Sequence, residues 1–337
     1  MTETLTKVSF GQTDMSITRA GFGAWAIGGG GWAFAWGDQE DGDSVAAIRH
    51  AVESGINWVD TAAVYGLGHS EEVVAQALRD LPEADRPYVF TKGGLVWDES
   101  DRKKRPSRVG NPASLRREVE ASLRRLGVDR IDLYQLHWPA EDGTPLEEYW
   151  QTFADLRTEG KIRAAGLSNH TMAQVAAAEA VAHVDSVQPQ FSLIHRDNGA
   201  GLIPWCREHG TGVIVYSPMG AGLLTGAFTP ERAANLDQGD WRSRSSDFTG
   251  EGLTRNLALV DGLRPVAERL GVSLGAVAVA WTLAFPGVSG AIVGARSPQQ
   301  VDGWLAAAEL VLDEKDLTEI AGAITSSGAG TGPVRPG

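Results

Sequence analysis

Four ionisable side chains end, or closely follow, short apolar runs of this sequence. Asp60 ends the run NWVD, Lys92 ends VFTK and His137 ends LYQLH, while Tyr65 follows Asp60 by five residues. Taken singly, an Asp at a strand end can cap a helix, a His can be a hydrogen-bonded core residue and a loop Tyr can lie at the surface. An ammonium group directly after an apolar strand needs a partner when it is buried. Asp60 suits that role, and the four side chains together would form one acid–base unit.

The elements that must position this unit repeat along almost the whole chain. Apolar spacing changes again and again from a run of four to six residues to a period near 3.6, which is typical of alternating strands and helices and of a parallel sheet. We expect strands at residues 20–23, 56–59, 88–91, 131–136, 162–167, 184–188, 212–216 and 290–293. Eight such units predict an α/β fold, a (β/α)8 TIM barrel, formed as a single domain over residues 1–337.

Three segments do not follow the repeat. Residues 7–19 suggest an N-terminal β-hairpin that could cover the bottom of the barrel. Residues 218–255 form a long loop after the seventh strand, and residues 326–337 form a Gly-, Ser- and Pro-rich tail that we expect to be flexible. Barrel enzymes carry their reactive groups at the C-terminal ends of the strands and in the loops that follow. Asp60, Tyr65, Lys92 and His137 should therefore meet at one rim.

Composition excludes several classes of function. The net charge of −13 argues against a nucleic-acid partner, because binding phosphates requires concentrated Lys and Arg. The sequence begins without an apolar signal region, and its longest apolar stretch, residues 275–285, is far shorter than the roughly 20 residues of a membrane span. Cys206 is the only cysteine, which fits a reducing compartment. We expect a cytoplasmic protein; the sequence does not determine its oligomeric state, although a monomer is favoured.

Several motifs resemble the aldo-keto reductase family, in the expected order and over nearly the whole chain. They are NWVDTAAVYGLGHSE (57–71), VFTKGG (89–94), DLYQLHWP (132–139), GLSNH (166–170), QPQFS (188–192), YSPMGAGLLTG (216–226) and IVGARSPQQ (292–300). The sequence is most similar to the bacterial branch that is related to potassium-channel β subunits.

The resemblance implies a mechanism. Tyr65 would donate a proton to the carbonyl oxygen of a small-molecule substrate, and Lys92 would lower the pKa of the phenol, which is ordinarily about 10. Asp60 would hold Lys92 in place and charged, and His137 would donate a hydrogen bond to the same oxygen. Hydride would come from a nicotinamide. The expected activity is NADPH-dependent reduction of aldehydes and ketones to alcohols, with NADP as the oxidised cofactor.

A cofactor site along the same rim also follows from the resemblance. Ser168, Asn169 and Gln190 would bind the carboxamide, and Tyr216 would stack on the nicotinamide ring. Glycines in the loop over residues 217–226 would let the backbone approach the pyrophosphate. The full expected set is Gly23, Ala24, Trp25, Asp60, Ser168, Asn169, Gln190, Tyr216, Ser217, Pro218, Gly220, Leu223, Gly226, Gly294, Arg296 and Gln300.

The last part of that site joins a cation to a helix start. Ser297 is expected to cap a helix that has Pro298 at its first position, and a helix N-terminus beside Arg296 is a good anion site. Arg296 could alternatively be a solvated loop charge. Gly303 and Trp304 stand where this family often has Glu-Asn, so the sequence leaves open how adenine is held.

The eleven tryptophans suggest an apolar substrate pocket. Trp32, Trp97 and Trp138 are expected to line it, and Trp36 and Trp241 also fall in rim loops. A slot of indoles would favour aromatic or bulky apolar aldehydes over free sugars, whose hydroxyls would stay unpaired there. The alternative is that these side chains fasten loops to the barrel.

Rival functions are distinguishable. The segment from Gly21 to Ala26 matches the dinucleotide fingerprint G-x-G-x-x-A, but four glycines at 28–31 prevent the helix that a Rossmann fold requires there. An NADPH-sensing regulatory protein of the same family, with slow turnover, remains open. A cofactor-free barrel isomerase also remains open, and it predicts no fluorescence change on adding NADPH.

Overall fold

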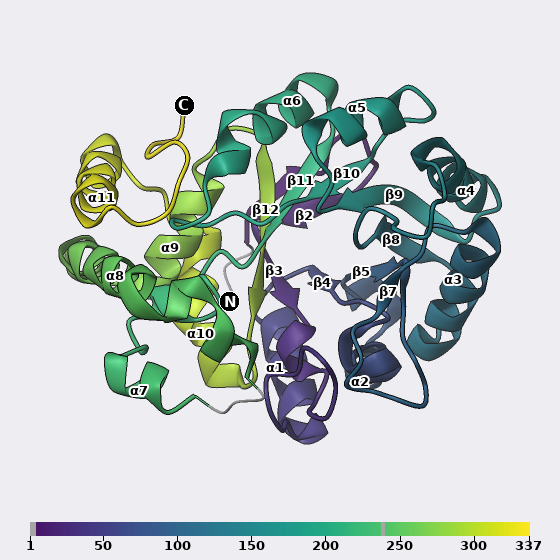
Figure 1. Ribbon diagram of the computed structural model, residues 1–337, viewed down its shortest axis with the longest axis horizontal. Coiled ribbons are helices and arrows are strands. Elements are labelled where there is room, and N and C mark those ends of the chain that lie inside the picture. Colours follow the sequence, from purple (N-terminus) through teal and green to yellow (C-terminus); the bar gives the residue numbers. More distant parts are fainter. Residues whose placement is uncertain (1–4, 237–239) are drawn as a thin grey trace.

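A closed barrel of eight parallel strands forms the centre of the molecule (Figure 1). The computed structural model describes residues 5–236 and 240–337. In barrel order the strands are β3 (Ala20–Gly23), β4 (Trp58–Asp60), β5 (Tyr88–Gly93), β8 (Ile131–Leu136), β9 (Ile162–Ser168), β10 (Ser186–Gln188), β11 (Gly212–Tyr216) and β12 (Val288–Gly294). This confirms the predicted (β/α)8 architecture.

Helices surround the barrel and follow its strands (Figure 1). They are α1 (Asp41–Glu53), α2 (His69–Leu78), α3 (Pro112–Leu126), α4 (Leu146–Thr158), α5 (Met172–Glu179), α6 (Leu202–His209), α7 (Pro230–Ala234), α8 (Gly250–Leu270), α9 (Leu274–Leu283), α10 (Pro298–Leu305) and α11 (Glu314–Ser327). Within residues 5–236 and 240–337, no single helix has the length and hydropathy to cross a membrane. Helices α8 and α9 have the required length and hydropathy only when they are taken together, and they are bent by 93° relative to each other.

Local sequence explains where a typical helix such as α3 begins and ends. The Asn111 side chain accepts hydrogen bonds from the backbone N–H groups of Ala113 and Ser114, with Pro112 in the first turn. Gly127 ends the helix in the left-handed conformation, φ 66°. Leu115 and Val119 are buried on the face toward the barrel. The helix therefore shields β5 and β8, whose ends carry Lys92 and lead into His137.

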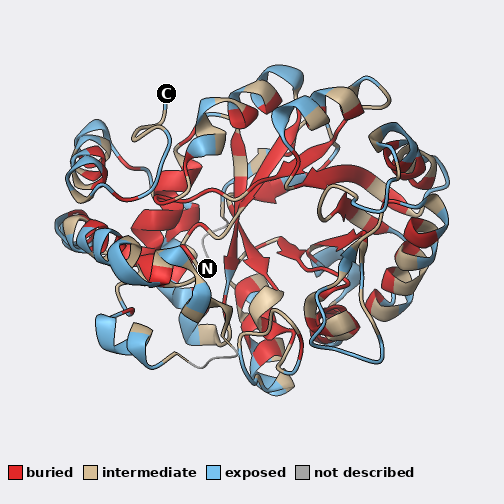
Figure 2. Ribbon diagram, viewed as in Figure 1, coloured by how far each residue is buried: buried red, intermediate tan, exposed pale blue. Residues whose placement is uncertain are grey.

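The barrel strands are buried along most of their length (Figure 2). A cluster of buried apolar side chains fills the lower part of the barrel interior. The predicted N-terminal hairpin is confirmed as β1 (Lys7–Ser9) and β2 (Ser16–Thr18), paired antiparallel. Phe10, from its turn, stacks on Phe90 with ring centroids 5.7 Å apart. The Trp58 indole fills the centre and donates a hydrogen bond to the Thr18 carbonyl, at 2.8 Å. A Cβ at Gly21 would overlap that indole, so the site must lie above this plug.

Three segments differ from the sequence expectation. A short antiparallel pair, β6 (Leu95–Val96) and β7 (Ser107–Arg108), follows β5. The long loop after β11 is shorter than residues 218–255, because α8 begins at Gly250. The tail that we expected to be flexible begins inside α11, at residue 326. The residues that follow α11 are hydrogen-bonded to Arg196, whose buried side chain donates to the Ala329 carbonyl at 3.1 Å. The backbone N–H of Arg196 donates to the Thr331 carbonyl at 3.0 Å. A buried guanidinium needs acceptors, and this segment supplies them.

Candidate active site

A buried ion pair forms the floor of the site. Asp60 ends β4 and Lys92 lies near the end of β5; the Lys92 side chain is fully buried, and its Nζ pairs with Asp60 Oδ1. Nζ also donates to the Thr61 carbonyl at 2.9 Å. Asp60 Oδ2 accepts a hydrogen bond from the Gln188 side chain at 2.9 Å. The expected partnership of these two residues is therefore present, and it leaves the floor with little net charge.

Tyr65 lies directly beside this pair. Lys92 Nζ is 5.2 Å from the centroid of the Tyr65 ring, and the ring meets His137 edge to face at 5.7 Å and 79°. The backbone after Tyr65 turns left-handed at Gly66, φ 63°, where a Cβ would overlap the Gly28 carbonyl. Glycine at position 66 thus permits the tight turn that holds Tyr65 over the rim.

Burial sets the protonation states of this cluster. It raises the pKa of Tyr65 well above the usual 10, and the Asp60 carboxylate adds to this. This direction is opposite to the lowering by Lys92 that the resemblance implied, because Lys92 is paired with Asp60 and burial dominates the pKa of the phenol. Burial, with the charges of Lys92 and Arg108, holds the pKa of His137 well below its usual value. Near neutral pH the site therefore presents a protonated phenol and a neutral imidazole.

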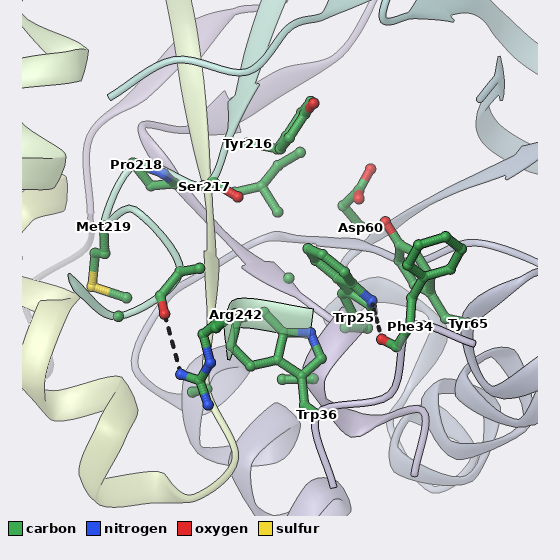
Figure 3. A pocket seen from close by; sticks show the side chains of 18 of the residues that line it. Trp25, Phe34, Trp36, Asp60, Tyr65, Tyr216, Ser217, Pro218, Met219 and Arg242 are labelled. Atoms are coloured by element: carbon green, nitrogen blue, oxygen red, sulfur yellow. Dashed lines mark hydrogen bonds between the residues drawn. The ribbon is translucent and has the colours of Figure 1, made fainter. Parts of the chain in front are cut away.

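A cavity of about 1080 Å³ opens above these groups. Figure 3 shows Trp25, Phe34 and Tyr65 on one side of it and Ser217, Pro218 and Met219 on the other. The residues that the sequence predicted and that line it are Gly23, Ala24, Trp25, Trp32, Asp60, Tyr65, His137, Trp138, Ser168, Asn169, Tyr216, Ser217, Pro218, Gly294, Arg296 and Gln300. Lys92 lies beneath the lining, where it contacts Asp60 and the Tyr65 ring.

Gln190 does not line the cavity, in contrast to the sequence expectation, and Gln188 does. Gln188 ends β10 beside Ser168 of β9, whereas Gln190 forms a bridge with Tyr216 beyond the strand. Gln188 donates through Nε2 to Asp60 and to Gln135 Oε1. Its own Oε1 makes no hydrogen bond to another described residue. Its position as the last residue of β10 could have identified Gln188, because barrel enzymes carry their reactive groups at the C-terminal ends of the strands.

Four other predicted residues also lie outside the lining. Gly220 (φ 57°) and Gly226 (φ 77°) shape the turns of the loop, and Leu223 is fully buried beneath it. Trp97 packs beside the cavity wall and donates through Nε1 to Glu99 at 2.9 Å, so its indole fastens the loop after β5. These four residues therefore support the walls of the cavity. The sequence pattern did not separate them from lining residues, because turns, loop packing and ligand contacts use the same residue types.

The end of the cavity above Tyr65 presents amide groups. Asn169 lies in the left-handed region, φ 61°, and donates through Nδ2 to the His137 carbonyl at 3.0 Å. Tyr216 Oη donates to Asn169 Oδ1 at 2.7 Å. Gln188 also lines the cavity, and its Oε1 could accept a hydrogen bond from a carboxamide N–H. This donor and acceptor set suits a nicotinamide.

The opposite end suits phosphates. The loop after β11 has left-handed residues at Ser217 (φ 56°), Ala221 (φ 53°) and Gly222 (φ 92°). A Cβ at Gly222 or Gly303 would meet no atom within 4 Å, so both glycines leave open space along the lining. At the start of α10, the Ser297 side chain makes no capping hydrogen bond, Pro298 has no N–H and the Gln300 N–H donates to the Ser297 carbonyl, so the N–H of Gln299 is left for an anion. The cavity therefore fits an extended dinucleotide.

Arg296 sits at this end and is held by the loop before α1. Its Nε donates to Gln39 Oε1 at 2.6 Å, and Gln39 Nε2 donates back to the Arg296 carbonyl at 3.0 Å. The guanidinium also donates to the backbone carbonyls of Trp36 and Asp38. No carboxylate in residues 5–236 or 240–337 pairs with it, so its positive charge is not neutralised. Gln39 is a site residue that sequence reasoning missed, since no local pattern links positions so far apart.

Aromatic rings build the wall beside Tyr65. Trp25 stacks on Tyr65 and on Trp241, with ring centroids 6.1 Å and 5.9 Å apart. The ring centroid of Trp32 lies 6.4 Å from that of Tyr65. Trp241 comes from the long loop after β11, and it also meets Trp36 edge to face at 5.8 Å. Both roles that the sequence left open are therefore present: Trp25, Trp32 and Trp36 line the cavity, whereas Trp241 does not line it and fastens the long loop to Trp25 and Trp36.

Comparisons with known proteins agree over nearly the whole chain. The model of the Aldo/keto reductase family matches residues 21–325. The chain is 35% identical, over 319 residues, to the aldo-keto reductase YhdN of Bacillus subtilis (strain 168), covering 93% of this chain and 92% of that protein. It is also 35% identical, over 323 residues, to the NADH-specific methylglyoxal reductase of Escherichia coli (strain K12), covering 93% and 96%.

A solved structure has the same arrangement. The glycerol dehydrogenase AKR11B4 from Gluconobacter oxydans superposes with a TM-score of 0.87 at 36% identity, and the match covers 97% of both chains. The holo form of the aldo-keto reductase AKR11C1 from Bacillus halodurans gives a TM-score of 0.75 at 25% identity, covering 95% of this chain and 96% of that one.

Proposed function

This chain belongs to the aldo/keto reductase family of oxidoreductases that act on carbonyl groups, and we propose that it reduces aldehydes and ketones to alcohols with Tyr65 as the proton donor. One observation carries the proposal. Tyr65 and His137 face the same end of the cavity, above the buried Asp60–Lys92 pair. The alternative of a slow NADPH-sensing regulatory protein is not supported, since the relatives named above are a reductase and a dehydrogenase.

In this proposal the substrate oxygen lies between the phenol and the imidazole. His137, neutral because its pKa is lowered, donates one N–H and orients the oxygen. Tyr65, protonated because its pKa is raised, gives its proton to that oxygen. The phenolate that remains lies beside Lys92, whose ammonium stabilises the new charge while Asp60 holds it in place. A bound nicotinamide would supply the hydride.

The cofactor would be held along the cavity by groups of this chain. Asn169, Ser168 and Gln188 would bind the carboxamide. The loop over residues 217–222 and the start of α10 would bind the phosphates through backbone N–H groups. We propose NADPH as the preferred cofactor, because the Arg296 guanidinium has no carboxylate partner within the described ranges and suits a 2′-phosphate. Family membership alone does not decide this, since one relative is named as NADH-specific.

The proposed substrates are aromatic or other bulky apolar aldehydes. The wall of Trp25, Trp32 and Phe34 beside Tyr65 would bury a flat ring. A sugar would leave hydroxyl groups unpaired against those indoles, which costs affinity.

The test follows NADPH absorbance with a substituted benzaldehyde and with xylose, using wild-type protein and Tyr65→Phe. We expect a higher kcat/KM for the benzaldehyde after correction for the open-chain fraction of the sugar. Tyr65→Phe should lower reduction by about a hundredfold or more, with NADPH affinity by fluorescence titration close to wild type. More than about a tenth of wild-type activity in the variant would overturn the role of Tyr65, and a faster sugar would overturn the apolar slot.

A further inference from the structure

The hairpin loop beside the cavity, residues 95–108, holds five basic and three acidic residues and is therefore basic overall in an acidic protein. Its basic residues are Arg102, Lys103, Lys104 and Arg105, which lie between β6 and β7, and Arg108 in β7, although the chain as a whole has a net charge of −13. We call residues 95–108 the mouth loop. Two of its cations, Arg105 and Arg108, line the cavity, and the other three do not. The mouth loop therefore directs positive charge toward the substrate end.

Of the two mouth-loop cations that line the cavity, Arg105 is the one with no acidic partner among the described residues. Its guanidinium carbon lies 5.4 Å from the centroid of the Phe34 ring, and it forms no ion pair with any residue in the described ranges 5–236 and 240–337. The centroid of the Phe34 ring lies 6.1 Å from that of Trp32, and the Trp32 centroid lies 6.4 Å from that of Tyr65. Two aromatic rings thus separate Arg105 from the proton donor.

Arg108 is already compensated. It pairs with Glu141, and its guanidinium lies 4.3 Å over the Trp138 ring, next to His137. Among the described residues, Asp60 and Glu141 are the two carboxylates that line the cavity, and each has a basic partner. Arg105 is therefore the uncompensated cation that the mouth loop contributes to the lining. Arg232 and Arg296, which also lack a carboxylate partner among the described residues, line the cavity from segments that follow β11 and β12.

We propose that the preferred substrates are carbonyl compounds that also carry a carboxylate, bound by Arg105 at the mouth while the carbonyl reaches Tyr65. The proposal rests on the proposed function and deepens it. The guanidinium fork matches a carboxylate in shape and charge, and the rings of Trp32 and Phe34 would contact the apolar part between the two groups.

Two substrates that differ only in charge test the proposal. The probes are 4-formylbenzoate, ionised at neutral pH, and its methyl ester, which share a ring, an aldehyde and an electron-withdrawing substituent. The measured quantity is the ratio of kcat/KM for the acid to kcat/KM for the ester. Arg105→Gln should lower this ratio about fivefold, the effect of an ion pair at an exposed site. Arg105→Lys should lower it less, because it retains the charge.

Matched variants separate local binding from general charge. Lys103→Gln removes the same charge from the same loop at an exposed position that does not line the cavity, and it should change the ratio less than twofold. Glu141→Gln should raise the ratio, because it removes the acidic charge at the mouth. Salt at about 1 M should bring the wild-type ratio close to that of Arg105→Gln.

The outcomes are distinct. An equal loss in Lys103→Gln and Arg105→Gln, or a change below twofold in Arg105→Gln, would overturn the proposal while leaving the proposed function intact, provided that the ester is reduced. Failure to reduce either compound with any cofactor would instead overturn the proposed function.

Discussion

Replacing Asp60 by Asn removes the counter-ion of a fully buried ammonium group and leaves its shape almost unchanged. Lys92 would keep one strong acceptor, the Thr61 carbonyl at 2.9 Å. Removing one partner of a buried ion pair typically costs about 3–5 kcal/mol, because the other charge stays desolvated. We expect Asp60→Asn to lower the free energy of unfolding by about 3 kcal/mol, near the lower end, since that carbonyl remains.

The pH dependence of this variant has a definite sign. Burial already lowers the pKa of Lys92, and only Asp60 and Glu71 oppose it. Without Asp60 the folded-state pKa falls further below the value of about 10.4 in the unfolded chain. Between these two values the unfolded chain binds more protons, so the stability of Asp60→Asn should rise with pH up to about 10. Below the folded-state pKa of Lys92, the folded and unfolded chains bind the same number of protons at this residue, and the variant is least stable there.

A double-mutant cycle measures the interaction free energy between Asp60 and Lys92. Lys92→Met leaves a buried carboxylate and should also be destabilised, whereas Asp60→Asn with Lys92→Met buries no charge and should be more stable than either single variant. Urea unfolding followed by tryptophan fluorescence gives the free energies. The control is Asp261→Asn, which breaks an exposed pair with Arg264 and should cost less than about 1 kcal/mol. A loss below about 1 kcal/mol in Asp60→Asn, or a double variant less stable than both singles, would refute the reasoning.

Three further predictions concern the cofactor and the proton. Arg296→Ala should weaken NADPH binding by about 1.5–3 kcal/mol and barely affect NADH, measured by fluorescence titration; equal losses would show that Arg296 does not bind the 2′-phosphate. Gly222→Val should weaken both cofactors, because its side chain enters the phosphate end, whereas Gly143→Val at a similarly left-handed turn outside the lining should weaken neither. Because the pKa of Tyr65 is raised and that of His137 is lowered, kcat for reduction should be flat between about pH 6 and 9. The rate of alcohol oxidation, which needs the phenolate, should rise about tenfold per pH unit over the same range. A reduction rate that falls across this range would contradict the protonated phenol.

Sequence alone determined the barrel and the four groups of the acid–base unit. Asp60 and Lys92 lie at the ends of apolar runs, and His137 directly follows one. In a closed parallel barrel all C-terminal strand ends meet at one rim, so a local pattern in sequence becomes proximity in space. The same reasoning placed Tyr65 near them, because five residues after Asp60 cannot carry it far from that rim.

Tertiary structure decided what depends on contacts between distant segments. Gln39 holds Arg296, Gln188 rather than Gln190 reaches Asp60, and Arg105 meets Phe34 instead of an acid. The raised pKa of Tyr65 is a result of the same kind, since it depends on how completely Asp60 neutralises Lys92 and on how much water packing removes. Local periodicity records which face of an element is buried, but it carries no information about which side chain lies opposite, and charge compensation depends on that partner.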